Sequence, residues 1–190
     1  MSREFGLKVG IITFFCDAFK GGIPALISYF VYRGYVFAGS DVIVADFTRY
    51  FCGVCVIIGH IYPVTMKFRG GKGIASTLGL FWINLGCENP WFLLVGFAAF
   101  WLIAFYIVGT EWGSMGSLIG VSGFGVWQAI LFWFRYRVEP SNIYVVLLFL
   151  LIFLIDFLTW FAHRKNIMRL LAGEEHRTSV KKMVSKKKKA

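Results

Sequence analysis

The chain has 190 residues, of which 58% are hydrophobic and only 16% are charged, and its formal net charge is +10. This composition excludes a soluble nucleotide-hydrolysing enzyme, and the length predicts one compact helical bundle. Most of the net charge comes from the last thirty residues, where it fits membrane topology and attraction to anionic lipid. We therefore expect an integral membrane protein that contacts membrane lipids and binds no nucleic acid.

The apolar stretches predict an all-α, polytopic membrane bundle with about five full spans and one short or re-entrant helix. A span needs about 20 residues, and the stretches near that length cover about 9–32, 42–66, 90–109, 114–134 and 142–162. A sixth stretch, about 74–86, is too short to cross upright. We assign residues 1–177 to the membrane bundle and residues 178–190 to a basic, disordered cytoplasmic tail.

The distribution of charge predicts that both termini lie in the cytoplasm. With six membrane segments the termini share one face, which would carry Arg3, Lys8, Lys67, Arg69, Lys72 and the basic tail. The opposite face would carry Arg33, Arg135 and Arg137 together with Asp41, Glu88 and Glu139. Because Lys and Arg concentrate on the cytoplasmic side of membranes, we expect a multi-pass protein of the cell (inner) membrane with its functional face toward the cytoplasm.

Two spans contain a charged pair at the spacing i, i+3, which places both side chains on one face of a helix. Asp17 and Lys20 form the first pair, and Asp46 and Arg49 form the second. An unpaired charge in lipid costs about 2.5–3.5 kcal/mol on insertion scales. We expect a structural ion pair for Asp46 and Arg49, whereas Asp17 and Lys20 lie nearer the cytoplasmic edge and fit a structural or a functional role.

A glycine-rich basic loop separates the second span from the short helix. Gly70, Gly71, Lys72 and Gly73 precede a helix N-terminus, where backbone N–H groups and a cation together suit a phosphate group. The spacing excludes a Walker A motif, because Gly73 stands where that motif needs Ser or Thr. A sharp turn with cations placed by membrane topology is the alternative; the phosphate site is the interpretation we favour.

The remaining motifs predict no metal site and no cofactor. Cys52 and Cys55 form a C-x-x-C pair that lacks the second pair needed for zinc. At the end of the last span, helical spacing places His163, Asn166 and Leu170 on one face, directed back at the bundle.

Three blocks of this sequence, occurring in order, resemble the bacterial acyl-phosphate:glycerol-3-phosphate acyltransferases, the PlsY family of integral membrane enzymes. They are Asp17-Ala-Phe-Lys20-Gly21 with Ile23-Pro24-Ala25, the stretch from Gly59-His60-x-x-Pro63 to Thr77, and the segment from His163 to Arg177. Ser114-Met-Gly-Ser117 is similar to the family's Ser-x-x-Ser at a cytoplasmic helix start. The resemblance implies transfer of a fatty acyl group from acyl phosphate to the 1-hydroxyl of sn-glycerol 3-phosphate, giving lysophosphatidic acid and phosphate in phospholipid biosynthesis.

The resemblance also implies roles for individual residues. Lys72, Asn166, His163 and His60 would be catalytic, with Asn166 and His163 orienting glycerol 3-phosphate or stabilising developing charge. A structural role for His60, beside Pro63, is an equal alternative. The substrate phosphate would be held by Arg3, Gly70, Gly71, Gly73, Ser114 and Ser117. No metal or nucleotide is required, and the enzyme that forms acyl phosphate is a candidate partner.

Two other functions are compatible with these residues, and the sequence differs from the family pattern at one place. The same cationic loop fits a non-enzymatic anion-binding protein, such as a transporter or channel subunit, although we find no inverted repeat. An inactive paralogue is the other alternative. The family begins with a further helix and a Gly-Ser-Gly-Asn loop, of which Arg3 would be the remaining trace, so we expect little or no activity from these 190 residues alone.

Overall fold

The structure is a computed structural model that describes residues 2–174, with side chains from residue 8 onward. The basic tail expected over residues 178–190 lies outside the described residues, as does the side chain of Arg3. The helical elements, in order, are α1 (Ser2–Tyr32), α2 (Val44–Ile61), the 3-10 turn η1 (Val64–Met66), α3 (Ile74–Glu88), α4 (Trp91–Thr110), α5 (Gly113–Tyr136), α6 (Ile143–Ala162) and α7 (Arg164–Leu171).

Five helices in the described chain are long and apolar enough to cross a membrane, which confirms the predicted fold class. They cover Lys8–Tyr32, Val44–Met66, Trp91–Thr110, Gly113–Tyr136 and Ile143–Ala162. The sixth element is short, as predicted: α3 has 15 residues, or roughly 22 Å at 1.5 Å per residue, against a hydrocarbon core of about 30 Å. It begins after Gly73 and ends before Asn89 and Pro90, where proline cannot continue the hydrogen-bonding pattern.

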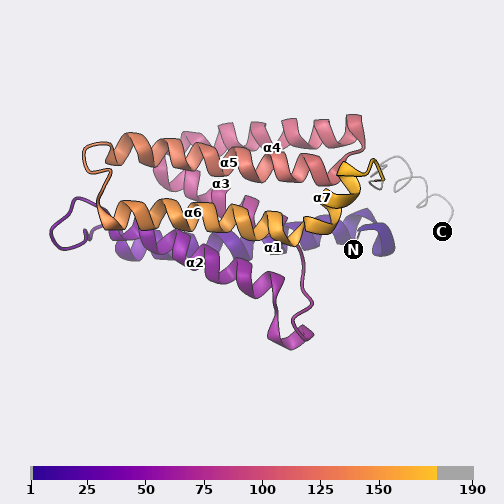
Figure 1. The fold of residues 1–190 in the computed structure, drawn as a ribbon, viewed down its shortest axis with the longest axis horizontal. Helices are drawn as coiled ribbons and strands as arrows, with labels where there is room; N and C mark the ends of the chain where they lie inside the picture. Colours follow the sequence, from indigo (N-terminus) through magenta and orange to yellow (C-terminus); the bar gives the residue numbers. More distant parts are fainter. Residues whose placement is uncertain (1, 175–190) are drawn as a thin grey trace.

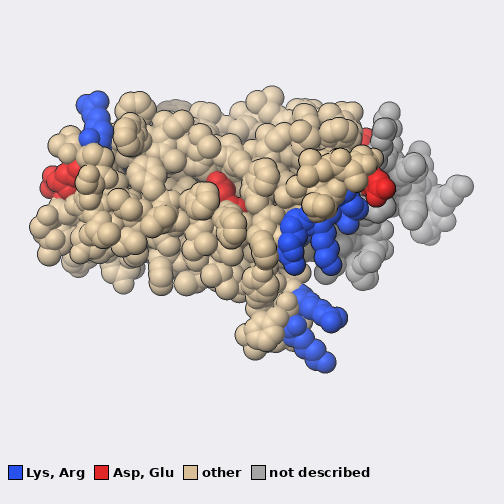
Figure 2. Space-filling view, in the orientation of Figure 1, with Lys and Arg blue, Asp and Glu red and all other residues tan. Residues whose placement is uncertain are grey.

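The long helices run side by side along the longest axis of the molecule (Figure 1). The α2–α3 loop, the connection between α4 and α5, and α7 lie at one end, which we call the basic end; the connections between α1 and α2 and between α5 and α6 lie at the other, the far end (Figure 1). In Figure 2 many of the Lys and Arg side chains gather over α7 and the α2–α3 loop, while the flank between the ends is largely uncharged. The short helix α3 packs against α1, α4, α5, α2 and α6 and is therefore the centre of the bundle.

The α1–α3 contact brings two backbones together. A Cβ atom on Gly21 would lie 2.1 Å from the carbonyl oxygen of Ser76, and one on Gly79 would lie 2.2 Å from that of Ala18. Neither position has space for a side chain, so the small-residue pattern typical of close membrane helices is a requirement here.

Glu88 and Arg135, which were expected on the face opposite the glycine loop, form ion pairs with Asp46 and Arg49 that were not predicted. The side chain of Glu88 is only 4% exposed. The reason is that α3 ends against α2 and α5, so its last carboxylate meets the side chains of those helices. The predicted pair of Asp46 and Arg49 is confirmed, at 2.7 Å.

Candidate active site

The α2–α3 loop begins where Tyr62 and Pro63 end α2. Two consecutive residues with side chains, Lys67 (φ 53°) and Phe68 (φ 59°), then adopt left-handed backbone conformations. The amides of Met66 and Phe68 donate to the carbonyl of Pro63, at 3.1 and 3.0 Å, so the loop folds back on itself. Gly73 (φ +83°) begins α3 in a conformation that favours glycine, and its carbonyl accepts from the amide of Thr77 at 2.8 Å.

The backbone amides of Gly70 and Gly71 bond to α2. Gly70 N–H donates to the carbonyl of Ile61 at 3.2 Å, and Gly71 N–H donates to that of His60 at 3.1 Å. A Cβ on Gly71 would lie 2.1 Å from Nε2 of His60, so the imidazole packs directly on this glycine. In this conformation both amides complete the end of α2, and the sequence-based expectation that they hold phosphate has no support from the hydrogen bonds described here.

Lys72, which follows these glycines, reaches across to α7. Its Nζ donates to Oδ1 of Asn166 at 2.9 Å. Arg169, one turn further along α7, donates to the same oxygen at 2.7 Å. Nδ2 of Asn166 donates to the hydroxyl of Ser114, in the first turn of α5, at 2.6 Å. One amide side chain thus joins the glycine loop, α5 and α7, and it brings two cations to a single oxygen atom.

A break between α6 and α7 places Asn166 in this position. His163, buried at the end of α6, has backbone angles of −92° and 0°, and α7 starts in a new direction at the next residue. Nδ1 of His163 lies 2.9 Å from the carbonyl oxygen of Thr159, and since a carbonyl can only accept, Nδ1 carries the proton. The hydroxyl of Thr159 lies 3.0 Å from that of Thr77, which links α6 to the first turns of α3.

The Asp17–Lys20 pair forms as predicted, with Nζ of Lys20 donating to the Asp17 carboxylate at 2.7 Å. Nδ1 of His60 lies 3.7 Å from the same carboxylate. His60 also packs on Gly71, so the same imidazole contacts both the charged pair on α1 and the glycine loop. The described contacts therefore place His60 between the charged pair and the loop.

The structure brings together some of the predicted site residues and leaves others apart. Lys72, Asn166 and Ser114 form one hydrogen-bonded group, whereas Ser117 donates to the carbonyl of Gly113 within its own helix, at 2.8 Å. Sequence reasoning missed Arg169, although its i, i+3 spacing from Asn166 was a usable signal. It also missed the Thr77–Thr159 contact, because nothing local in the sequence indicates which spans are neighbours.

Chemically, the basic end offers ammonium, guanidinium, amide, hydroxyl and imidazole groups on four segments. Such a set suits an anionic substrate whose charge changes during reaction, because donors fixed in advance stabilise developing charge. Within residues 2–174, no three His, Cys, Asp or Glu side chains lie close enough together to hold a metal ion.

Comparison with known proteins agrees with this chemistry. Residues 1–173 match the family model described as glycerol-3-phosphate acyltransferase. The glycerol-3-phosphate acyltransferase of Aquifex aeolicus is 36% identical over 190 residues, covering 93% of this chain and 78% of the relative. That of Finegoldia magna is 34% identical over 173 residues, covering 91% and 73%.

Two crystal structures have the same fold. They show PlsY (YgiH), an integral membrane glycerol 3-phosphate acyltransferase, in its glycerol 3-phosphate form and its lysophosphatidic acid form, each 30% identical to this chain. The TM-scores are 0.66 and 0.65, and the matches cover 96% of this chain and 78% and 79% of those chains. These matches confirm the family predicted from the three sequence blocks. The chain belongs to the glycerol-3-phosphate acyltransferases of the PlsY family, which are integral membrane enzymes.

Proposed function

We propose that this enzyme transfers a fatty acyl group from acyl phosphate to the 1-hydroxyl of sn-glycerol 3-phosphate, and that the basic end of the bundle is its active site. The observation that supports this site most directly is the convergence of Lys72 and Arg169 on one amide oxygen, at 2.9 and 2.7 Å. A phosphate dianion beside this oxygen could accept charge-assisted hydrogen bonds from both cations.

The reaction needs positioning and charge stabilisation more than a strong base. The hydroxyl oxygen of glycerol 3-phosphate attacks the acyl carbonyl carbon, a new ester C–O bond forms, and the bond from that carbon to the phosphate oxygen breaks. The departing phosphate accepts the hydroxyl proton, so atoms and charge balance without a further reactant. Lys72 and Arg169 would stabilise the phosphate charge, and Asn166 would fix their directions through its bonds to both cations and to Ser114.

The acyl chain would lie among the spans. An apolar cavity of about 80 Å³ is formed by α1, α3, α4 and α5, and Leu78 and Gly79, next to Thr77, belong to its lining. Its other lining residues are aromatic or aliphatic, among them Phe14, Phe19, Phe97, Phe100 and Phe124. Such a surface suits hydrocarbon, and its place beside the first turns of α3 would leave the acyl carbonyl near the cations.

Orientation and partners follow from charge. The basic end carries Lys67, Arg69 and Lys72 on its loop and further cations on α7, a distribution that favours the cytoplasmic side. We therefore propose that the protein lies in the inner membrane and that its site faces the cytoplasm. Glycerol 3-phosphate, which is soluble in water, would reach the site from that side. The enzyme that makes acyl phosphate is the partner expected to supply the second substrate, which stays in the membrane because of its chain.

The test is an assay in nanodiscs with palmitoyl phosphate and glycerol 3-phosphate, in which phosphate release and the acylated product are both measured. We expect equimolar phosphate and product, formed only when both substrates are present. Palmitoyl-CoA in place of palmitoyl phosphate should give no product, because the chain lacks the His-x-x-x-x-Asp pair of acyltransferases that use thioesters.

Comparable rates with palmitoyl-CoA would overturn the donor assignment. Glycerol 3-phosphate binding without turnover, measured by calorimetry, would instead indicate the inactive paralogue considered above. Absence of both binding and turnover would remove the basic end as a substrate site.

A further inference from the structure

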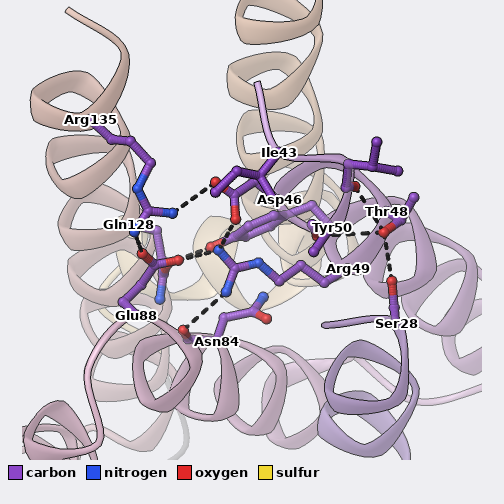
Figure 3. Close-up of polar contacts among 12 residues, drawn as sticks. Ser28, Ile43, Asp46, Thr48, Arg49, Tyr50, Asn84, Glu88, Gln128 and Arg135 are labelled. Carbon is purple, nitrogen blue, oxygen red and sulfur yellow. Dashed lines mark hydrogen bonds and ion pairs between the residues drawn. The ribbon is translucent and has the colours of Figure 1, made fainter. Parts of the chain in front are cut away.

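A second polar group lies at the C-terminal end of α3, whereas Lys72 precedes its N-terminal end. Figure 3 shows the contacts of this group. It contains two carboxylates and two guanidinium groups, and we call it the charge ring: Asp46 and Arg49 of α2, Glu88 of α3 and Arg135 of α5. Arg49 pairs with both Asp46, at 2.7 Å, and Glu88. Arg135 also pairs with both, at 2.7 Å from Asp46. Each acid therefore bridges both bases, and the ring is closed and electrically neutral.

Neighbouring side chains hold the ring in place. The hydroxyl of Tyr136 donates to Asp46 at 2.5 Å and accepts from the amide of Ile43 at 3.2 Å. Beside the ring, the hydroxyl of Tyr50 donates to Gln128, whose amide nitrogen donates to the carbonyl of Phe81 in α3 at 3.1 Å. These contacts join α2, α3 and α5.

Burial makes the ring costly to break. The side chains of Arg49, Asp46 and Glu88 are 0%, 2% and 4% exposed, and that of Arg135 is 35% exposed. Removing one member leaves an uncompensated charge at low dielectric, whereas a buried ion pair contributes little more stability than apolar residues that fill the same space. Stability alone is therefore a weak reason for four buried charges, and a role in fixing geometry explains them better.

The charge ring includes the last residue of α3, the helix at the centre of the bundle. Where α3 meets α1 backbone to backbone, at Gly21 and Gly79, neither glycine has a side chain that could set the position of α3 along its axis. Near its start, the Thr77–Thr159 hydrogen bond sets its register against α6. Glu88, the last residue of α3, is the one residue that α3 contributes to the charge ring. Its carboxylate pairs with cations from two other helices, α2 and α5. Each end of α3 is thus fixed by a polar contact.

We propose that the charge ring sets the axial position of α3 and thereby positions Lys72, which lies two residues before α3 begins; the catalytic part of this inference rests on the proposed function. Glu88 is a positioning residue that acts through α3. A rigid helix transmits a displacement at its C-terminal end to its N-terminal end, and a misplacement of about 1 Å in an active site can cost about 10²-fold in rate.

The test separates positioning from stability with two variants. Glu88→Gln has nearly the same shape but leaves the ring with a net positive charge. Glu88→Gln combined with Arg135→Gln restores neutrality and keeps the Arg49–Asp46 pair, yet α3 still has no ion pair to the ring. The matched control is Glu139→Gln, which changes an acid beyond the end of α5 that bonds only to Asn142 among the contacts described.

We expect the melting temperature to fall in the single variant and to recover in the double variant. We expect kcat, per folded protein, to fall about tenfold or more in both, with a smaller change in the KM for glycerol 3-phosphate. The Glu139→Gln control should match the unmodified protein in both measurements. A kcat that recovers together with the melting temperature would show that the ring contributes stability only and would overturn the proposal.

A second measurement decides the inference even if the protein proves inactive. Hydrogen exchange of the amides over residues 77–81, which begin with the bond from Thr77 N–H to the carbonyl of Gly73, reports the order of the first turns of α3. Both Glu88 variants should raise this exchange while residues 91–110 of α4 keep theirs. Unchanged exchange over 77–81 would refute a positioning role, whereas absence of acyl transfer by the unmodified protein would refute only the proposed function.

Discussion

The two polar groups of this bundle use similar side chains in opposite ways. In the charge ring each cation is bonded to two carboxylates, and three of the four side chains are almost fully buried. At the basic end Lys72 and Arg169 instead converge on the oxygen of a neutral amide, that of Asn166. The charge ring is a closed, neutral group that joins helices inside the bundle. The second arrangement directs two cations to one point at the end of the bundle, where an anionic substrate could bind.

The same contrast appears in the two charged pairs with i, i+3 spacing. Asp46 and Arg49 are buried and extend into a network, whereas the side chains of Asp17 and Lys20 are 25% and 44% exposed. The two pairs have equal spacing in sequence, but breaking them should change the free energy of unfolding by very different amounts. The reason is that one pair is buried at low dielectric and the other is partly exposed to water. The following predictions test this contrast.

The largest effect is expected from Arg49→Met. This change removes the most buried cation of the ring and leaves Asp46 and Glu88 sharing only Arg135, so we expect the free energy of unfolding to fall by about 3–5 kcal/mol. Titration with SDS in mixed micelles measures it. Arg49→Lys, which keeps the charge but lacks the planar guanidinium that contacts Asp46, Glu88 and the carbonyl of Asn84, should lose less. Equal stability of Arg49→Met and the unmodified protein would contradict the interpretation of the ring as a coupled unit.

Lys72→Met should leave folding intact and lower kcat/KM about 10²–10³-fold, or about 2.7–4 kcal/mol of transition-state stabilisation. The reason is that one of the two cations beside Asn166 is lost. The matched control is Lys67→Met, which removes an exposed lysine from the same loop. Equal losses in the two variants would mean that the loop acts through its overall charge and not through the position of Lys72.

Gly71→Ala should lower kcat/KM by about tenfold or more, because its Cβ would lie 2.1 Å from Nε2 of His60 and must displace the imidazole or the loop. Gly59→Ala is the control, since this glycine is one residue before His60 and has no atom within 4 Å of the added Cβ. The two variants are compared at equal folded concentration. Similar activity of Gly71→Ala and Gly59→Ala would show that the contact with His60 is unimportant.

The sequence predicted the features of the fold that depend on one segment at a time. Both the positions of the spans and the shortness of α3 follow from the lengths of the apolar stretches. These features are local, so hydrophobicity suffices to predict them.

Contacts between segments were predictable only in part. Motif resemblance selected Lys72, Asn166 and Ser114, which the structure joins through hydrogen bonds. The ion pairs of Glu88 and Arg135 were not predicted, because no local signal shows that α3 ends against its neighbours. Charge partners in a bundle depend on which helices pack together, and a single sequence does not contain that information in local form.

The smallest effect is expected from Lys20→Met, which breaks the pair with Asp17 at the basic end. Because the side chain of Lys20 is 44% exposed, water screens the charge that remains on Asp17, and we expect the free energy of unfolding to change by less than about 1 kcal/mol. The carboxylate also keeps its neighbour His60, 3.7 Å away, so the glycine loop should hold its position and kcat should change less than about twofold. SDS titration and the phosphate-release assay measure the two quantities. A large loss of kcat with unchanged stability would assign the Asp17–Lys20 pair to the active site, and the contrast between the two pairs would then be one of function as well as burial.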